Sequence, residues 1–151
     1  MPVSVLTLLA FLIGGNVHDG DTFTSIDGTR WRLYGVDALE LDQVCGGQPC
    51  GEMARDALEQ LIAGQQVDCE SRGRSYGRIV GQCHVGDLDL SREMIRAGWA
   101  FDEPDFSHGI YSYDETIARD HRRGMWGMSG VVRPREWRKL NDTTTVRASA
   151  K

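Results

Sequence analysis

Short segments with alternating apolar and polar residues dominate the first half of the chain. Residues 22–26 alternate weakly, and the Asp-Gly pair at 27–28 is typical of a tight hairpin turn. Residues 30–36 form the expected partner strand, in which Trp31 and Arg32 point to opposite faces because side chains alternate along a strand. This pattern predicts a β-hairpin near the start of the fold.

A second pair of strands is expected at residues 66–71 and 78–85, around a turn rich in glycine and arginine. Cys69 and Cys83 lie equally far from the middle of that turn. On an antiparallel hairpin they would therefore face each other, close enough to bridge if the geometry is right.

Helical spacing of apolar residues appears first between residues 52 and 63. The residues of this apolar stripe are Ala54, Ala57, Leu58, Leu61 and Ile62. Gly64 provides the stop. A short helix is expected over residues 91–98, and a last one from Ser112, which forms a capping box with Glu115.

The element order is strand, strand, strand, helix, strand, strand, helix, helix. That order suits a mainly β protein with helices, built as a small closed Greek-key barrel. We expect one domain over residues 16–140, preceded by a hydrophobic segment at 1–15 and followed by a polar, flexible tail at 141–151.

The hydrophobic run at residues 3–13 is shorter than the ~20 residues that a membrane span needs. It has the length of a signal-peptide core, although no Lys or Arg precedes it and no clear cleavage site follows. We interpret it as a secretion signal or its remnant, and a first strand is the alternative.

The composition of the chain and its net charge limit the possible functions. The chain has 151 residues, of which 40% are apolar and 26% charged, with a net charge of -5, so it is an ordinary globular chain that is acidic overall. A passive nucleic-acid binder usually carries a basic footprint. An enzyme that uses carboxylates on a metal and a few arginines on phosphate escapes that objection.

The four cysteines are Cys45, Cys50, Cys69 and Cys83. An even number in a small domain favours two disulfides and an oxidising compartment. A zinc site is the weaker alternative because no C-x₂-C knuckle occurs. Buried free thiols are the third interpretation.

Three segments carry charged residues that suit phosphate chemistry. The first places Asp19 and Asp21 on either side of a glycine at the entry of a strand, which a turn alone would also explain. The second runs over residues 32–40, from an arginine on a strand to two acids just beyond the strand end. The third, at residues 74–78, sets arginines in a hairpin turn, where a guanidinium could fork onto a phosphate.

Taken together, these motifs resemble the staphylococcal nuclease-like (thermonuclease) family over residues 17–138. The matching motifs, in order, are DGDT, R-L-Y-G-V-D-A-L-E, G-R-S-Y-G-R, A-G-W-A, R-G-M-W and the closing Trp137-Arg138. Each motif is weak alone, but their joint order and spacing are specific.

The resemblance implies a five-stranded OB-fold Greek-key barrel with about three helices. It also implies a calcium-dependent nuclease that cuts DNA or RNA and leaves 3′-phosphate ends. The Ca²⁺ ligands of the family correspond to Asp21, Asp37 and the main-chain carbonyl of Ala38.

The same resemblance implies that Glu40 activates a water and that Arg32 and Arg78 bind the phosphate. Tyr76 and Tyr113 are candidates to contact the nucleotide, although Tyr113 could equally be a packing residue because of its helical spacing. Disulfides Cys45–Cys50 and Cys69–Cys83 would fit secreted bacterial members of the family. Together with the hydrophobic N-terminus, the cysteines predict a secreted or periplasmic protein, and we expect it to be a monomer.

The chain departs from the family at Leu39, where a proline is usual. Proline fixes φ, so leucine is expected to loosen the approach to Glu40. Two other functions stay open. One is a domain of this fold that binds nucleic acid or protein without catalysis, and the other is an exported accessory protein of an envelope pathway.

Overall fold

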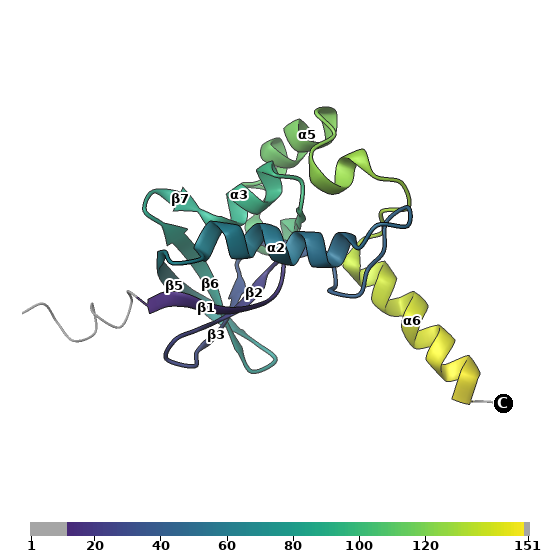
Figure 1. Cartoon of the computed structure of the whole chain (residues 1–151), viewed down its shortest axis with the longest axis horizontal. Coiled ribbons are helices and arrows are strands. Elements are labelled where there is room, and N and C mark those ends of the chain that lie inside the picture. Colours follow the sequence, from purple (N-terminus) through teal and green to yellow (C-terminus); the bar gives the residue numbers. More distant parts are fainter. Residues whose placement is uncertain (1–11, 150–151) are drawn as a thin grey trace, which may run out of the picture.

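The body of the molecule is a small barrel (Figure 1). The computed structural model describes the backbone of residues 12–149 and the side chains of residues 15–142. Residues 1–11, which hold most of the predicted export signal, lie outside that part of the chain. From Leu12 onward the chain is strand β1, so the end of the hydrophobic segment belongs to the sheet.

Five strands close the barrel, in the order β3-β2-β1-β5-β6, because β3 also pairs with β6. The strands of the barrel are β1 (Leu12–Asp19), β2 (Thr22–Ser25), β3 (Arg30–Leu33), β5 (Gln66–Ser75) and β6 (Arg78–Val85). The closing pair β3–β6 is parallel, and the other neighbours in the ring are antiparallel. This confirms the expected five-stranded barrel, to which β7 (Leu88–Asp89) adds a short extension.

The hairpin between β2 and β3 forms where the sequence predicted it. Gly28 adopts φ +85°, which the tight turn requires. The Asp27 carboxylate accepts hydrogen bonds from the Ser25 hydroxyl and the Thr29 backbone N–H. Local hydrogen bonds therefore stabilise the turn without contacts from distant parts of the chain.

The strand expected over residues 30–36 is broken at Gly35, which has φ +75°. The chain turns there, and Val36–Ala38 becomes a separate strand, β4, which pairs with β8 (Ala100–Asp102). A side chain at Gly35 would meet Ser107 and Tyr111 at 3.0 and 3.1 Å, so the glycine also permits close packing. The break carries Asp37 away from the barrel sheet and onto a second, smaller one.

The helical segments are α2 (Cys50–Ile62), α3 (Leu90–Arg96), α4 (Pro104–Ser107), α5 (Ser112–Asp120), the 3₁₀ turn η1 (Gly124–Gly127) and α6 (Pro134–Ser149). Helices α2 and α3 pack on the barrel, α5 packs on α3, and α6 projects away from the barrel (Figure 1). The apolar stripe predicted for the first of these helices is confirmed, since Ala54, Leu58 and Ile62 are buried on α2. Among the described residues, no helix is long and apolar enough to cross a membrane.

Two predictions about helices are wrong. The capping box at Ser112 does not form, because the Ser112 hydroxyl donates to the Gly109 carbonyl and Glu115 accepts from the backbone N–H of Asp102. The helix from Ser112 is also not the last, since α6 follows and its backbone extends through the segment assigned to a polar tail. Its sequence is polar, so the apolar stripe that would have marked it is weak.

The core has two parts. The barrel core includes Phe23, Leu33, Leu58, Leu90 and Met94. A second cluster lies beneath the chain between β4 and α2, and consists of Leu39, Cys45, Cys50, Ala54, Phe101 and Met125. This second cluster supports the residues that follow β4.

Both expected disulfides are present. Cys69 and Cys83 occupy directly opposed positions on β5 and β6. Cys45–Cys50 joins the loop after β4 to the first residue of α2. The zinc and free-thiol interpretations are thereby excluded.

Removal of the Cys69–Cys83 disulfide by a double alanine substitution should lower the free energy of unfolding by about 3 kcal/mol. It closes a loop over 14 positions, whereas Cys45–Cys50 spans 5, so the corresponding Cys45/Cys50 variant should lose less. Urea unfolding of both variants measures the difference. A larger loss from the Cys45/Cys50 variant, or free thiols in the denatured, non-reduced protein, would contradict this.

Candidate active site

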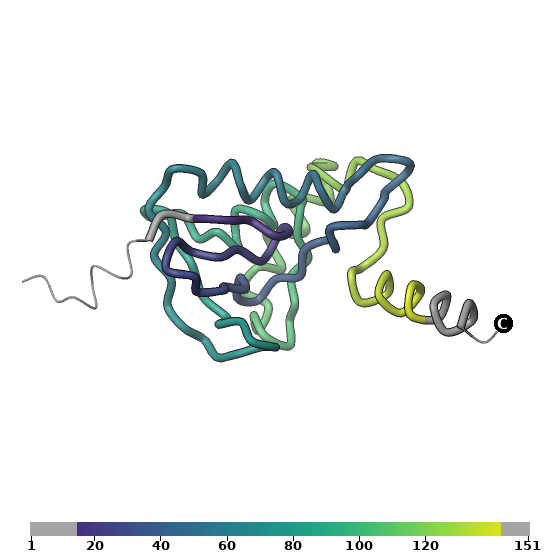
Figure 2. The backbone as a smooth tube through the Cα atoms, turned by 60° about the horizontal axis from the view of Figure 1, so that its bottom comes forward, coloured from purple at the N-terminus to yellow at the C-terminus, as the bar shows by residue number. Residues whose placement is uncertain are grey.

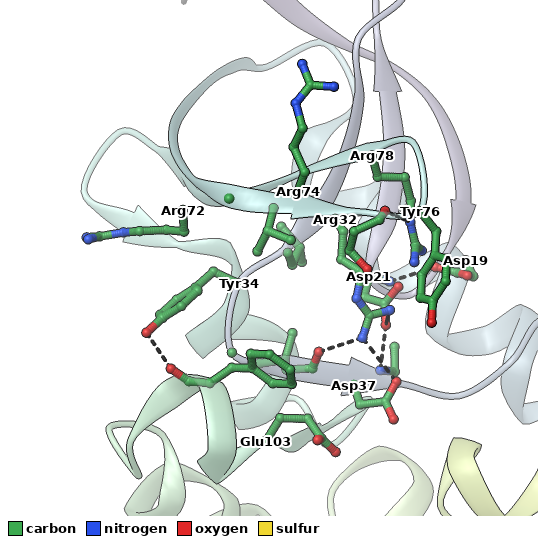
Figure 3. A pocket seen from close by; sticks show the side chains of 18 of the residues that line it. Asp19, Asp21, Arg32, Tyr34, Asp37, Arg72, Arg74, Tyr76, Arg78 and Glu103 are labelled. Atoms are coloured by element: carbon green, nitrogen blue, oxygen red, sulfur yellow. Dashed lines mark hydrogen bonds and ion pairs between the residues drawn. The ribbon is translucent and has the colours of Figure 1, made fainter.

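A groove of about 1030 Å³ opens beside the barrel, between β3, β4, the β5–β6 hairpin and the start of α6 (Figure 3). Its walls carry both acidic and basic side chains. The charged residues that line it are Asp19, Asp21, Arg32, Asp37, Glu40, Arg72, Arg74, Arg78, Glu103, Arg135 and Arg138.

At the centre of the groove, the Arg32 guanidinium lies between two carboxylates. Its Nη1 is 2.9 Å from Asp21 Oδ2, and its Nη2 is 3.3 Å from Asp37 Oδ1. The same Nη2 donates to the Val36 carbonyl at 3.1 Å. Arg32 therefore pairs with two buried acids, one from the turn between β1 and β2 and one from β4.

Asp21 is fixed by further hydrogen bonds. Its Oδ1 accepts from the Thr22 hydroxyl at 2.9 Å, and its Oδ2 accepts from the Ala38 backbone N–H at 2.9 Å. The turn between β1 and β2 approaches β4 closely at Gly20, where a Cβ would meet the Ala38 and Ala54 methyl groups at 2.8 and 3.0 Å. The glycine thus allows Asp21 to reach the end of β4.

Arg78 begins β6 and enters the groove from the hairpin side. Its Nη1 donates to the Thr22 hydroxyl at 3.2 Å, and its Nε donates to the Ser75 carbonyl at 3.3 Å. Neither partner is charged. Unlike Arg32, Arg78 therefore keeps a positive charge that no ion pair among the described residues balances.

Burial shifts the ionisation of these groups. Burial, and then the negative charge of Asp21, raises the pKa of Asp37 to about 6. Burial and the neighbouring Asp21 also raise the pKa of Asp19. Burial alone would lower the pKa of Arg32, but Asp21 and Asp37 raise it overall. Around Arg32, the carboxylates of Asp19, Asp21 and Asp37 carry more negative charge than its single positive charge can offset.

Comparison with known proteins shows the family to which this chain belongs. A family model described as staphylococcal nuclease homologue matches residues 30–128, which is more than half of the chain. The chain belongs to the staphylococcal nuclease homologue family. This membership confirms the expected family and its enzyme class, hydrolytic nucleases.

Individual proteins that are similar to this chain also carry the names of nucleases. A protein of Escherichia coli named as an endonuclease is 32% identical over 129 residues, which cover 81% of this chain and 80% of that protein. A probable staphylococcal-like nuclease of Oryza sativa is 33% identical over 111 residues, 72% of this chain but 21% of the plant protein. A probable endonuclease of Komagataella phaffii is 33% identical over 122 residues, 72% of this chain and 54% of the yeast protein.

The groove brings together nearly every site residue expected from the sequence. Those that line it are Asp21, Arg32, Asp37, Ala38, Glu40, Tyr76 and Arg78. Tyr76 is 97% exposed at the rim. Tyr113 is on α5, largely exposed, and does not line the groove.

The sequence assigned no role to several other residues that line the groove. Asp19 stood beside Asp21 in the first charged segment, and its Oδ1 accepts the Asp21 backbone N–H at 3.0 Å. Tyr34 and Phe106 are linked by a 2.6 Å bond from the Tyr34 hydroxyl to the Phe106 carbonyl. Arg138 belongs to the closing Trp137-Arg138 motif of the resemblance, which gave it no role in the site, and nothing local to Phe106 points to the groove.

The donor chemistry of the groove fits a hard divalent cation, because carboxylate and carbonyl oxygens are the ligands that Ca²⁺ prefers. Asp21 and Asp37 offer such oxygens, and a cation there would offset the burial that raises the pKa of Asp37. Within the described residues, no three His, Cys, Asp or Glu side chains already converge with metal-binding geometry. The fit of the groove to a divalent cation therefore rests on the chemical type of its donor atoms, which are carboxylate and carbonyl oxygens.

Replacement of Arg32 by glutamine should lower the free energy of unfolding by about 3 kcal/mol, because it leaves Asp21 and Asp37 buried without a counter-charge. Arg78→Gln is the matched control. Its loss should be about 1 kcal/mol or less, since Arg78 bonds only to neutral oxygens. Urea unfolding at pH 7 measures both, and equal losses would show that the ion pairs of Arg32 do not hold the groove.

Proposed function

We propose that this protein is a calcium-dependent phosphodiesterase that hydrolyses DNA or RNA and leaves 3′-phosphate ends. The observation that carries the proposal is the groove itself. It collects two buried acids, two arginines and Glu40 from separate segments within a single opening. That combination of metal ligands, phosphate-binding cations and a carboxylate base is what metal-assisted phosphodiester hydrolysis requires.

In this proposal, Asp21, Asp37 and the Ala38 carbonyl hold the Ca²⁺. The bound ion would supply Lewis-acid polarisation of a phosphate oxygen and a template for the substrate. Glu40 orients a water and accepts its proton as the new bond to phosphorus forms. The Glu40 side chain is 31% exposed, so water reaches it from the groove.

The two arginines stabilise the negative charge that develops on the phosphate oxygens. They are placed differently for this task. Arg32 directs its Nη groups toward Asp21 and Asp37, whereas Arg78 has only neutral partners. Arg78 can therefore bind a phosphate without leaving a buried carboxylate unpaired.

The rim of the groove suits a nucleic acid despite the acidic net charge of -5. Arg72, Arg74 and Arg135 line it, and Tyr76 and Phe106 present exposed rings on which bases could stack. A local basic rim attracts the phosphate backbone even on an acidic protein. Nucleic acid is therefore the substrate class that we propose.

We also propose export to the periplasm or the medium. Both disulfides lie within this one small domain. Such bonds persist in oxidising compartments and are rare in the cytosol.

Purified protein should cleave single-stranded DNA in the presence of calcium, and cleavage should stop when a chelator is added. Products should carry 3′-phosphate ends, which block extension by a polymerase until a phosphatase removes them. Arg78→Lys should cleave more slowly, since lysine lacks the forked donors. Cleavage that persists in chelator, or no cleavage in calcium at any protein concentration, would reject the proposal.

Glu40→Gln should retain calcium binding and lose about 10²–10⁴-fold in turnover, because the amide cannot accept the proton of the water. Calcium binding is measured by isothermal titration calorimetry and turnover by single-turnover cleavage. Glu52→Gln, an exposed acid on α2, controls for the loss of one negative charge. Unchanged turnover in Glu40→Gln would show that Glu40 is not the base.

A further inference from the structure

The loop that carries Glu40 is tied to the start of α6, which lies beyond the region matched by the family model. Glu40 Oε1 forms an ion pair with Arg138 Nη1. Trp137 Nε1 donates to Asp42 Oδ1 at 3.1 Å. Figures 1 and 2 both show the loop ahead of α2 running beside the segment that leads into α6.

Gln43 is the buried link in this connection, with 1% of its surface exposed. Its Oε1 accepts the Glu40 backbone N–H at 2.7 Å, and its Nε2 donates to the Val132 carbonyl at 3.0 Å. The Gln43 backbone N–H also donates to the Glu40 carbonyl at 2.9 Å. One side chain therefore joins the backbone of Glu40 to the segment before α6.

On its other side, the Glu40 backbone packs against the first turn of α2. A Cβ at Gly51 would lie 1.9 Å from the Glu40 carbonyl oxygen, so the two backbones are in direct contact. The Gly51 N–H donates to the Gln43 carbonyl at 3.1 Å. Glu40 is thus enclosed between α2 and the segment that leads into α6.

We propose that residues 132–138 form a brace that orients Glu40, with Arg138 as the positioning residue that holds the Glu40 carboxylate through Oε1. This role rests on the proposed function of Glu40 as the general base. A carboxylate held by one oxygen keeps the other for the water, and a fixed orientation is what proton transfer in a transition state requires.

The brace affects the orientation of Glu40 more than it affects the free energy of unfolding. Half of the Arg138 side chain is exposed, and ion pairs of that kind contribute little to the free energy of unfolding. Loss of orientation at a reacting group, by contrast, can cost up to about 10²-fold in rate. The brace also supplies contacts at the corner where Leu39 replaces the usual proline, and Leu39 itself is fully buried in the second core cluster.

Arg138→Gln should lower kcat by about 10- to 100-fold while KM changes little. Arg138→Lys should restore part of kcat, because lysine keeps the charge and part of the reach. Lys139→Gln removes the neighbouring charge of α6 outside the groove and should leave kcat unchanged. A rise in KM with kcat unchanged would overturn the positioning role and indicate a phosphate contact instead.

The dependence on Glu40 is tested in a double-mutant cycle. In the Glu40→Gln background, Arg138→Gln should have no further effect on kcat, since the group that it positions is gone. The same loss in both backgrounds would show that Arg138 acts on the substrate directly. If Glu40→Gln by itself leaves turnover unchanged, it is the proposed base that fails.

Hydrogen exchange tests the brace without any activity. In Arg138→Gln and in Trp137→Phe, the backbone amides of residues 40–43 should exchange faster than in wild type, while the β5–β6 hairpin should be unchanged. Trp137→Phe removes the N–H donor to Asp42 and keeps an aromatic, though smaller, ring at this position. Unchanged exchange at residues 40–43 in both variants would overturn the brace, whatever the outcome for catalysis.

Discussion

The guanidinium of Arg32, placed between Asp21 and Asp37, is the interaction on which the groove depends. Two buried carboxylates repel each other and lose their hydration, and the rise in the pKa of Asp37 shows that cost. Arg32 bonds to both and to the Val36 carbonyl, so it joins the turn after β1, strand β3 and strand β4. The same group that would bind phosphate thus also holds the metal-ligand candidates in place.

Backbone close approach is what brings these three segments together. Gly20 lets the β1–β2 turn touch Ala38 and Ala54, and Gly35 breaks the strand so that Asp37 leaves the barrel sheet. Gly51 lets α2 lie directly on the Glu40 carbonyl. At Gly20 and Gly51 a Cβ would collide with neighbouring atoms at 2.8 and 1.9 Å, and at Gly35 the positive φ favours glycine.

Support for the groove comes from two sides that differ in chemistry. Beneath the loop after β4, an apolar cluster around Leu39 and the Cys45–Cys50 disulfide fills the space between β4 and α2. At the outer end, polar contacts from the start of α6 hold the same loop. The loop is therefore fixed by packing on one face and by directed hydrogen bonds on the other.

The sequence by itself determined the elements whose stability is local. The Asp-Gly turn at 27–28, the apolar stripe of α2 and the pairing of Cys69 with Cys83 all follow from short-range geometry, and the structure has all three. The order of the charged motifs pointed to the groove residues from Asp21 to Arg78.

Only the tertiary structure decided which residues surround these motifs. Arg138 and Glu40 are 98 positions apart, so no periodicity or turn rule links them. The packing of Gly35 against Ser107 and Tyr111 and the position of Tyr113 outside the groove depend likewise on contacts between distant segments, which a local pattern does not encode. Helix α6 was not predicted because its polar sequence has no strong apolar stripe.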